Sequence, residues 1–208
     1  GRRGHRPLLH RANAVAAMRM RAILPLLLLA MLAACGGIEA VRPGRVEIGG
    51  GLSVQSAPAW NRLPAETLGA DQVWSQDGPA LDRLLFLAGR AEGEPLLQRS
   101  RARRSLQFQA AMTPTEIAEL WASELALAGY RAVEVGRLQP AAFAGRNGFR
   151  FQYAYADANG LIFDGFAIGT VVAGRLYFIA FAGTRAHHFR AYWPAAMQVI
   201  GSAQIATG

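Results

Sequence analysis

The strongest constraint on the fold is a run of strand-like segments between residues 131 and 182, joined by very short connections. In one segment every second residue is aromatic, and the residues between are polar, charged or small. This two-residue period predicts a strand with one buried face. The connections at 157–160 and 173–174 are too short for the crossover that parallel strands need, so we expect an antiparallel meander. The aromatic row consists of Phe149, Phe151, Tyr153 and Tyr155.

A helix with clear signals at both ends precedes this meander. Thr113 can cap its start, Pro114 suits the first helical position, and Glu116 can complete a capping box. Gly129 is placed to end the helix in a left-handed conformation. Between these ends, apolar residues recur at helical spacing, which predicts one buried face. They are Ile117, Leu120, Trp121, Leu125 and Ala128.

A second helix is predicted near the end of the chain, from about His187 to Ile200. Its apolar residues also recur at helical spacing, and they are Phe189, Trp193, Ala196, Met197 and Ile200. Pro194 lies inside this segment and cannot donate a backbone hydrogen bond, so we expect the helix to kink or to restart there.

The region from 45 to 110 reads as a series of short strands. Alternating apolar residues flank Gly49–Gly51, and further strand patterns occur at 73–74, 81–88 and 106–110. The whole element order predicts one α+β domain over residues 45–208, a sandwich in which two helices pack on a mostly antiparallel sheet of about six to seven strands. We expect one of the helices to cover the aromatic row.

This element order, together with the helix start Met112–Leu120 (MTPTEIAEL), resembles the PsbP-like α/β sandwich family between Val46 and Ile205. The resemblance implies an assembly, docking or stabilising module rather than an enzyme of one reaction. No binding residue of that family can be placed on this sequence position by position.

The N-terminal region carries a targeting signal. Met18–Arg21 is basic, and residues 22–34 are uncharged and too few to span a bilayer, which is typical of a signal peptide over 18–34. Cleavage by an ordinary signal peptidase would place Leu32 or Met31 three residues before the cut, where a small residue is preferred. Residues 1–17 are interpreted as an over-extended start, with Met18 or Met20 as the true first residue; a twin-arginine signal at Arg2–Arg3 is the alternative.

The sequence Leu32-Ala33-Ala34-Cys35 resembles the lipobox of bacterial lipoproteins. The resemblance implies that Cys35 carries a diacylglyceryl thioether and becomes the first residue, so the partner of this end is a membrane. Gly36 is not the aspartate of an inner-membrane retention signal, which favours the outer membrane with the domain facing the periplasm. Residues 35–44 would form a tether.

The net charge of +8 comes mostly from the N-terminal region. Residues 1–34 contain six arginines and no acidic residue, whereas the chain from Cys35 onward has 16 arginines against 14 acidic residues. A charge this close to balance gives no field for nucleic-acid binding. Cys35 is the sole cysteine, so a domain after the leader has no internal disulfide.

Two pairs of residues are candidates for chemistry. His187 and His188 are adjacent, so on a helix they point about 100° apart and cannot share a metal. Asp157 and Asp164 flank a hairpin and could form an acid–base pair, but aspartate is common beside such turns for backbone reasons. The sequence has no nucleophile-elbow or phosphate-loop motif. We therefore expect no metal, no cofactor and no catalysis.

One concentrated basic patch remains, made of Arg99, Arg101, Arg103 and Arg104. It could contact anionic headgroups, the phosphates of an envelope polymer or an acidic face of an envelope protein. A solvated loop is the alternative.

These observations predict a lipid-anchored, non-catalytic docking or assembly module of the cell envelope. The alternative is a carrier or sensor of a small apolar ligand held between sheet and helix. A deep cavity beside Tyr153 and Tyr155 would favour the carrier, and a filled core with an exposed apolar or arginine-rich patch would favour docking. Carboxylates or histidines clustered in a cleft would instead indicate an enzyme.

Overall fold

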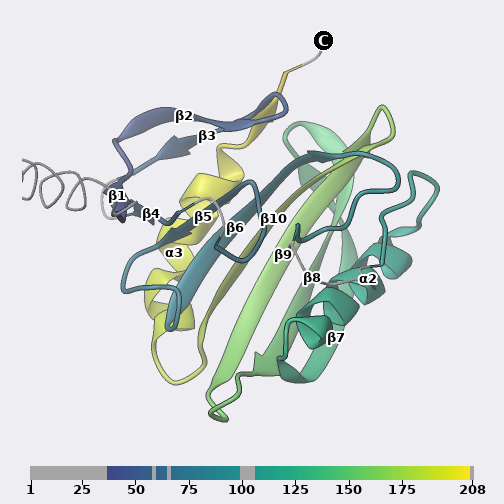
Figure 1. Ribbon diagram of the computed structural model, residues 1–208. Coiled ribbons are helices and arrows are strands. Elements are labelled where there is room, and N and C mark those ends of the chain that lie inside the picture. Colours follow the sequence, from purple (N-terminus) through teal and green to yellow (C-terminus); the bar gives the residue numbers. More distant parts are fainter. Residues whose placement is uncertain (1–36, 58–59, 65–66, 99–105, 207–208) are drawn as a thin grey trace, which may run out of the picture. The chain divides into compact units, whose positions relative to one another are not determined.

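The computed structural model describes residues 37–57, 60–64, 67–98 and 106–206. In this part of the chain, two helices lie on opposite faces of a large antiparallel sheet (Figure 1). The helices are α2 (Pro114–Leu127) and α3 (His188–Gly201). Neither of them, nor any other described helix, is long and apolar enough to cross a membrane.

The large sheet has eight strands in the order β1-β4-β5-β6-β10-β9-β8-β7, and every neighbouring pair is antiparallel. The predicted meander is confirmed as its β7–β10 half, with hairpins at 157–161 and 173–174. The strands are β1 (Glu39–Ala40), β4 (Asn61–Arg62), β5 (Gln72–Ser75), β6 (Asp82–Arg90), β7 (Arg131–Phe143), β8 (Arg146–Ala156), β9 (Ile162–Val172) and β10 (Arg175–Thr184).

A smaller sheet has three strands, in the order β11-β3-β2. The prediction of six to seven strands was therefore too low. Three of the additional strands span only two residues each, which is too short for an alternating pattern to show in the sequence. The strands of the smaller sheet are β2 (Gly44–Gly49), β3 (Leu52–Ser56) and β11 (Gln204–Ile205).

Two segments differ from their expected structure. Part of the predicted tether 35–44 belongs to the fold, because β1 pairs with β4 and Val41 is buried, with its amide donating to the Trp60 carbonyl at 2.8 Å. The predicted strand at 106–110 is wrong: it makes one isolated bridge, Pro95 to Gln107. The segment contacts the loop after β6 instead of the sheet: Phe108 exchanges backbone hydrogen bonds with Gly93 and Glu94 at 2.8 and 2.9 Å, and its side chain is buried in the core.

Helix α2 begins and ends as its sequence predicts. The Glu116 amide donates to the Thr113 hydroxyl at 3.3 Å, and the Thr113 amide donates to the Glu116 carboxylate at 2.6 Å, which completes the capping box. Gly129 follows the helix with φ +92°, the conformation that favours glycine. The helix therefore enters and leaves the sheet surface at fixed points.

The aromatic row of β8 lies beneath α2, as expected. Trp121 of α2 meets Tyr153 edge-on with ring centroids 5.7 Å apart, and it also contacts Phe178 of β10 at 5.2 Å. The Tyr153 ring covers Gly165 of β9, where any added Cβ would overlap the ring. This face is filled by α2 and by loop residues such as Leu96, Leu97 and Phe108.

Helix α3 covers part of the other face. It lies over β10, with β6 and β9 on either side, and the β2–β3 hairpin lies beside it. The helix continues through Pro194, which is exposed, so the predicted restart at this residue is wrong. Its described N-cap, His187, makes no side-chain capping bond, in contrast to Thr113 of α2.

Candidate functional site: a groove beside helix α3

The sheet face that carries α3 is only partly covered. Because α3 lies over β10, the two strands at the far edge, β8 and β7, extend beyond it. Exposed side chains of β8 on this face include Arg150 and Gln152. An exposed sheet surface beside a helix forms a trough, and its lining decides what it can bind.

Two adjoining depressions of about 580 and 320 Å³ occupy this trough, and they share Arg150 and Phe166. We call them together the α3 groove. Its apolar lining comes from β9, α3 and residues 140–143 of β7, and its polar lining comes from β7 and β8. Its lining includes Phe166, Ile168, Trp193, Met197, Arg137 and Arg150.

The apolar part of the groove is held in place by aromatic contacts. Trp193 of α3 meets Phe166 of β9 edge-on with ring centroids 5.0 Å apart, and it contacts Phe189 at 5.4 Å. Trp193 is half-buried, whereas the other three tryptophans of the chain are fully buried. An aromatic side chain fixed on one side and open on the other is suited to contact a partner.

The polar part of the groove is positively charged. Arg150 donates to the Gln139 side chain at 3.0 Å, and neither Arg150 nor Arg137 forms an ion pair with any described residue. No carboxylate lines the described part of the groove. The acidic residues farther along this face, Asp164 and Glu134, interact with Arg185, which binds Asp164 at 2.7 Å.

Arg137 has an unusual backbone. It lies at a bulge of β7, between the pairs Gly136–Gln152 and Gln139–Arg150, with φ +50°. A non-glycine residue in this left-handed conformation costs about 1–2 kcal/mol. Ala132 has the same conformation, φ +48°, at a second bulge of β7.

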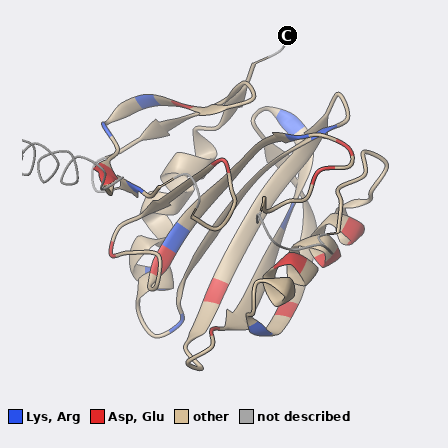
Figure 2. Ribbon diagram, in the orientation of Figure 1, with Lys and Arg blue, Asp and Glu red and all other residues tan. Residues whose placement is uncertain are grey.

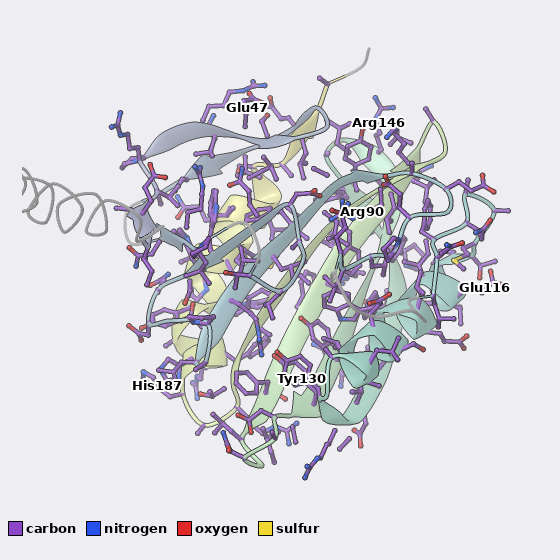
Figure 3. The ribbon with its side chains drawn as sticks, viewed as in Figure 1. Glu47, Arg90, Glu116, Tyr130, Arg146 and His187 are labelled. Atoms are coloured by element: carbon purple, nitrogen blue, oxygen red, sulfur yellow. The ribbon has the colours of Figure 1, made fainter. Side chains whose placement is uncertain are left out.

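On the opposite face, the described space beside the aromatic row of β8 is small. The cavity beside Tyr153 and Tyr155 has a volume of about 20 Å³, enough for roughly one water molecule. Arg83 of β6 fills this region: its guanidinium donates to the hydroxyl of Tyr155 and, at 2.7 Å, to that of Tyr130. Tyr130 lies between the end of α2 and the start of β7 (Figure 3). It also lies 5.2 Å from the centre of the Phe163 ring. Burial raises the pKa of Tyr155 to about 12.

The histidine pair lies at the start of α3. The His187 and His188 rings are edge-on with centroids 5.1 Å apart. His188 Nδ1 lies 2.7 Å from the Thr184 hydroxyl, and its Nε2 lies 3.5 Å from an Asp77 oxygen. Thr184 is only 3% exposed, so its hydroxyl is closed to a substrate.

These contacts have a structural role. Tyr192 of α3 also donates to Asp77, and this hydrogen bond raises the pKa of Tyr192 to about 12. The contacts of His188 and Tyr192 with Asp77 hold the start of α3 against the turn between β5 and β6. Within the described ranges, no three His, Cys, Asp or Glu residues are grouped to hold a metal.

The two aspartates considered as an acid–base pair have separate partners. Asp157 accepts hydrogen bonds from the backbone amides of Asn159 and Leu161 at 2.9 and 2.8 Å, which stabilise the hairpin. Asp164 binds Arg185 at 2.7 Å. Turn stabilisation, the alternative interpretation, accounts for Asp157.

Several sequence predictions concern residues outside the described part of the chain. They are the lipidation site Cys35, the signal peptide 18–34 and the basic patch Arg99, Arg101, Arg103 and Arg104.

The α3 groove was not predicted from the sequence, because its residues come from four separate elements. The signal available in the sequence was the pair of exposed arginines on neighbouring strands, with Trp193 near a helical apolar face.

Figure 2 shows how the charges divide between the two helices. Helix α2 carries Glu116, Glu119 and Glu124 and no basic residue, whereas the only charged residue of α3 is Arg190. Helix α2 is thus acidic, whereas the basic character of the α3 groove comes from Arg137 of β7 and Arg150 of β8.

No family model matches the sequence, and no curated protein matches it. Solved structures do. LpqN of Mycobacterium tuberculosis, described as involved in cell envelope biogenesis, has a TM-score of 0.47 and 12% identity over 82% of this chain and 91% of its own. A Bacteroides thetaiotaomicron protein has a TM-score of 0.46 and 9% identity over 80% of this chain and 50% of its own.

The structure of cyanobacterial PsbP from Synechocystis sp. PCC 6803 has a TM-score of 0.56 and 13% identity over 83% of this chain and 96% of its own. At this identity the similarity concerns the fold alone. The chain therefore has the PsbP-like α+β fold that its element order predicts.

Proposed function

We propose that this protein is a lipid-anchored, non-catalytic docking module of the bacterial cell envelope, and that the α3 groove is its docking surface. The anchor is Cys35, through the lipobox Leu32–Cys35. The domain faces the periplasm from the outer membrane, and the basic patch at 99–104 is an additional contact for anionic envelope components.

The observation that carries the docking role is the difference between the two faces of the sheet. A carrier needs an enclosed apolar cavity of about 300–1,000 Å³. The space beside Tyr153 and Tyr155 is about 20 Å³ and is closed by Arg83 and Trp121. The larger α3 groove is lined by exposed polar residues, including Arg137, Gln139 and Gln152, so it supports surface recognition rather than enclosure.

The docking role is tested by photo-crosslinking in living cells of the source bacterium. A photoreactive amino acid replaces Gln152 in the groove, and a matched control variant carries it at Glu119 on the outer surface of α2; both residues are exposed. We expect a discrete envelope-protein adduct from position 152 only. Adducts from position 119 alone, or none from position 152, would reject the α3 groove as the docking surface.

The anchor is tested separately. Mass spectrometry of the purified protein should find an acylated Cys35 as its first residue, and the Cys35→Ser variant should leave the membrane fraction. An unmodified N-terminus at another residue, or a Cys35→Ser variant that stays in the membrane fraction, would reject lipid anchoring.

A further inference from the structure

We infer that the α3 groove binds an amphipathic helix of a partner protein, and that acidic side chains of this helix pair with Arg137 and Arg150. This inference deepens the proposed docking function and rests on it. Four features of the molecule support it: the width of the groove, its charge, its apolar part and the backbone of β7.

The width of the open surface suits a helix. Neighbouring strands lie about 4.8 Å apart, so β8, two strands from β10, lies roughly 10 Å from the strand that α3 covers. Packed helices lie about 8–10 Å apart. A second helix over β8 would therefore contact both the sheet and α3, in the position that this fold leaves open.

The positive charge of the groove favours an acidic partner. Arg137 and Arg150 have no ion-pair partner among the described residues, and the described lining contains no carboxylate. Guanidinium groups bind carboxylates through paired hydrogen bonds. An acidic partner would supply the missing counter-charges, and a basic partner would be repelled.

The apolar part of the groove fits the other face of such a helix. Trp193 and Met197 lie four residues apart on α3, so they point to the same side, and Phe166 lies beside Trp193. A partner helix with apolar residues at the same spacing would cover these side chains. The occupant is thus acidic on one side and apolar on the other.

Addition of a partner strand to the edge of the sheet is the competing mode, and β7 is poorly suited to it. This edge strand has two irregularities, one between Arg131 and Glu134 and one between Gly136 and Gln139. Bulges twist an edge strand and interrupt its hydrogen-bonding row, which protects it from pairing. The second bulge instead places Arg137 at the groove.

The test measures binding of two synthetic peptides, each with 14 residues, the length of α3. Both have the same leucine face; one has glutamates at the polar positions and the other has lysines. The full-length protein is held in phosphatidylcholine nanodiscs, and fluorescence of the half-buried Trp193 reports occupancy. We expect the glutamate peptide to bind at least about tenfold more tightly than the lysine peptide.

Two variants remove the charges, and one is a matched control. Arg150→Gln and Arg137→Gly should each weaken glutamate-peptide binding about tenfold. Ala132→Gly makes the same backbone change as Arg137→Gly, at the other bulge of β7, and should leave binding unchanged. A defect caused by changing a β7 bulge to glycine would lower binding in both glycine variants, so this control separates it from the loss of the Arg137 charge.

Equal binding of the two peptides, or binding of the glutamate peptide that Arg150→Gln does not change, would overturn the inference. Strand structure in the bound peptide by isotope-edited infrared spectroscopy would overturn it in favour of edge pairing. Arginine-dependent binding to phosphatidylglycerol nanodiscs without peptide preference would overturn it in favour of lipid. Any of these results together with an adduct from position 152 in cells would leave the docking function intact.

Discussion

The two faces of the large sheet are built from the same strands but are completed differently. On the α2 face, a helix and the loops around Leu96 and Phe108 close over an aromatic core with about 20 Å³ of free space. On the α3 face, the helix and the β2–β3 hairpin stop at β9, and a groove remains over β8. Among the described residues, one face is thus closed by packing, and the other keeps an open surface.

The largest expected effect concerns Trp121 on the closed face. Trp121→Ala would remove a side chain that is 2% exposed and contacts Tyr153 and Phe178, so unfolding free energy should fall by about 3–5 kcal/mol. Trp193→Ala, on the open face, should cost much less because that side chain is only half-buried. Urea denaturation of both variants measures the difference, and equal losses would break the distinction between the faces.

Alkaline pH should also act mainly through the closed face. Burial raises the pKa of Tyr155 to about 12 from its ordinary value of 10, so the neutral phenol is favoured in the folded state. Its contribution, roughly 2–3 kcal/mol, is complete below pH 10 and is lost as the pH rises toward 12.

Stability measured between pH 10 and 12 in the wild type and in Tyr155→Phe checks this, because the variant should show a shallower decline. Tyr192 on the α3 side, whose pKa is also raised to about 12 by its bond to Asp77, is half-buried. An equal change of slope in Tyr192→Phe would argue against a special role for the closed face.

The ends of the two helices provide a smaller comparison. Thr113→Ala should destabilise the domain by about 1 kcal/mol because the capping box of α2 is lost. His187→Ala, at the uncapped start of α3, should have a smaller effect through capping. Thermal unfolding of the two variants measures this, and a larger loss for His187→Ala would contradict it.

Acidification should weaken the same cap. The pKa of Glu116 is lowered by hydrogen bonds from the Thr113 amide and hydroxyl. The stabilisation is therefore present above the ordinary glutamate pKa and disappears as the pH falls through the lowered value. Thr113→Ala should be less sensitive to pH in this range than the wild type.

The smallest expected effect is a gain in the stability of the domain. Arg137→Gly should relieve a left-handed strain of about 1–2 kcal/mol, partly offset by the larger chain entropy of glycine, for a net stabilisation of roughly 0.5–1 kcal/mol. Differential scanning calorimetry should show a higher Tm for this variant and for Ala132→Gly. A lower Tm for Arg137→Gly alone would mean that its side chain stabilises the fold, not only the groove.

Much of the fold could be predicted because its signals are local. The capping box at Thr113, the aromatic alternation along β8 and the short turns at 157–160 and 173–174 each fix one element or pairing. The strands β1, β4 and β11 could not be predicted, since two residues are paired there only by contacts distant in sequence. The strand predicted around Phe108 was wrong because an alternating pattern indicates which side chains are buried. A buried side chain does not require its segment to pair with another strand.

The groove could not be predicted from the sequence either, because its residues are brought together by contacts that are distant in sequence. Arg137 and Arg150 look like ordinary exposed residues until β7 and β8 pair, and Trp193 looks like a core residue until α3 is placed over β10. Arg83 is a further example: a strand arginine gave no sign of being buried against Tyr130 and Tyr155.

The most direct test of the difference between the faces is hydroxyl-radical footprinting of the purified protein and of intact envelopes. In the purified protein, Trp193 and Met197 should be oxidised readily while the buried Trp121 is protected. In intact envelopes, we expect Trp193 and Met197 to become protected as well, because a partner occupies the groove. Equal oxidation of Trp193 in both samples, or ready oxidation of Trp121, would contradict it.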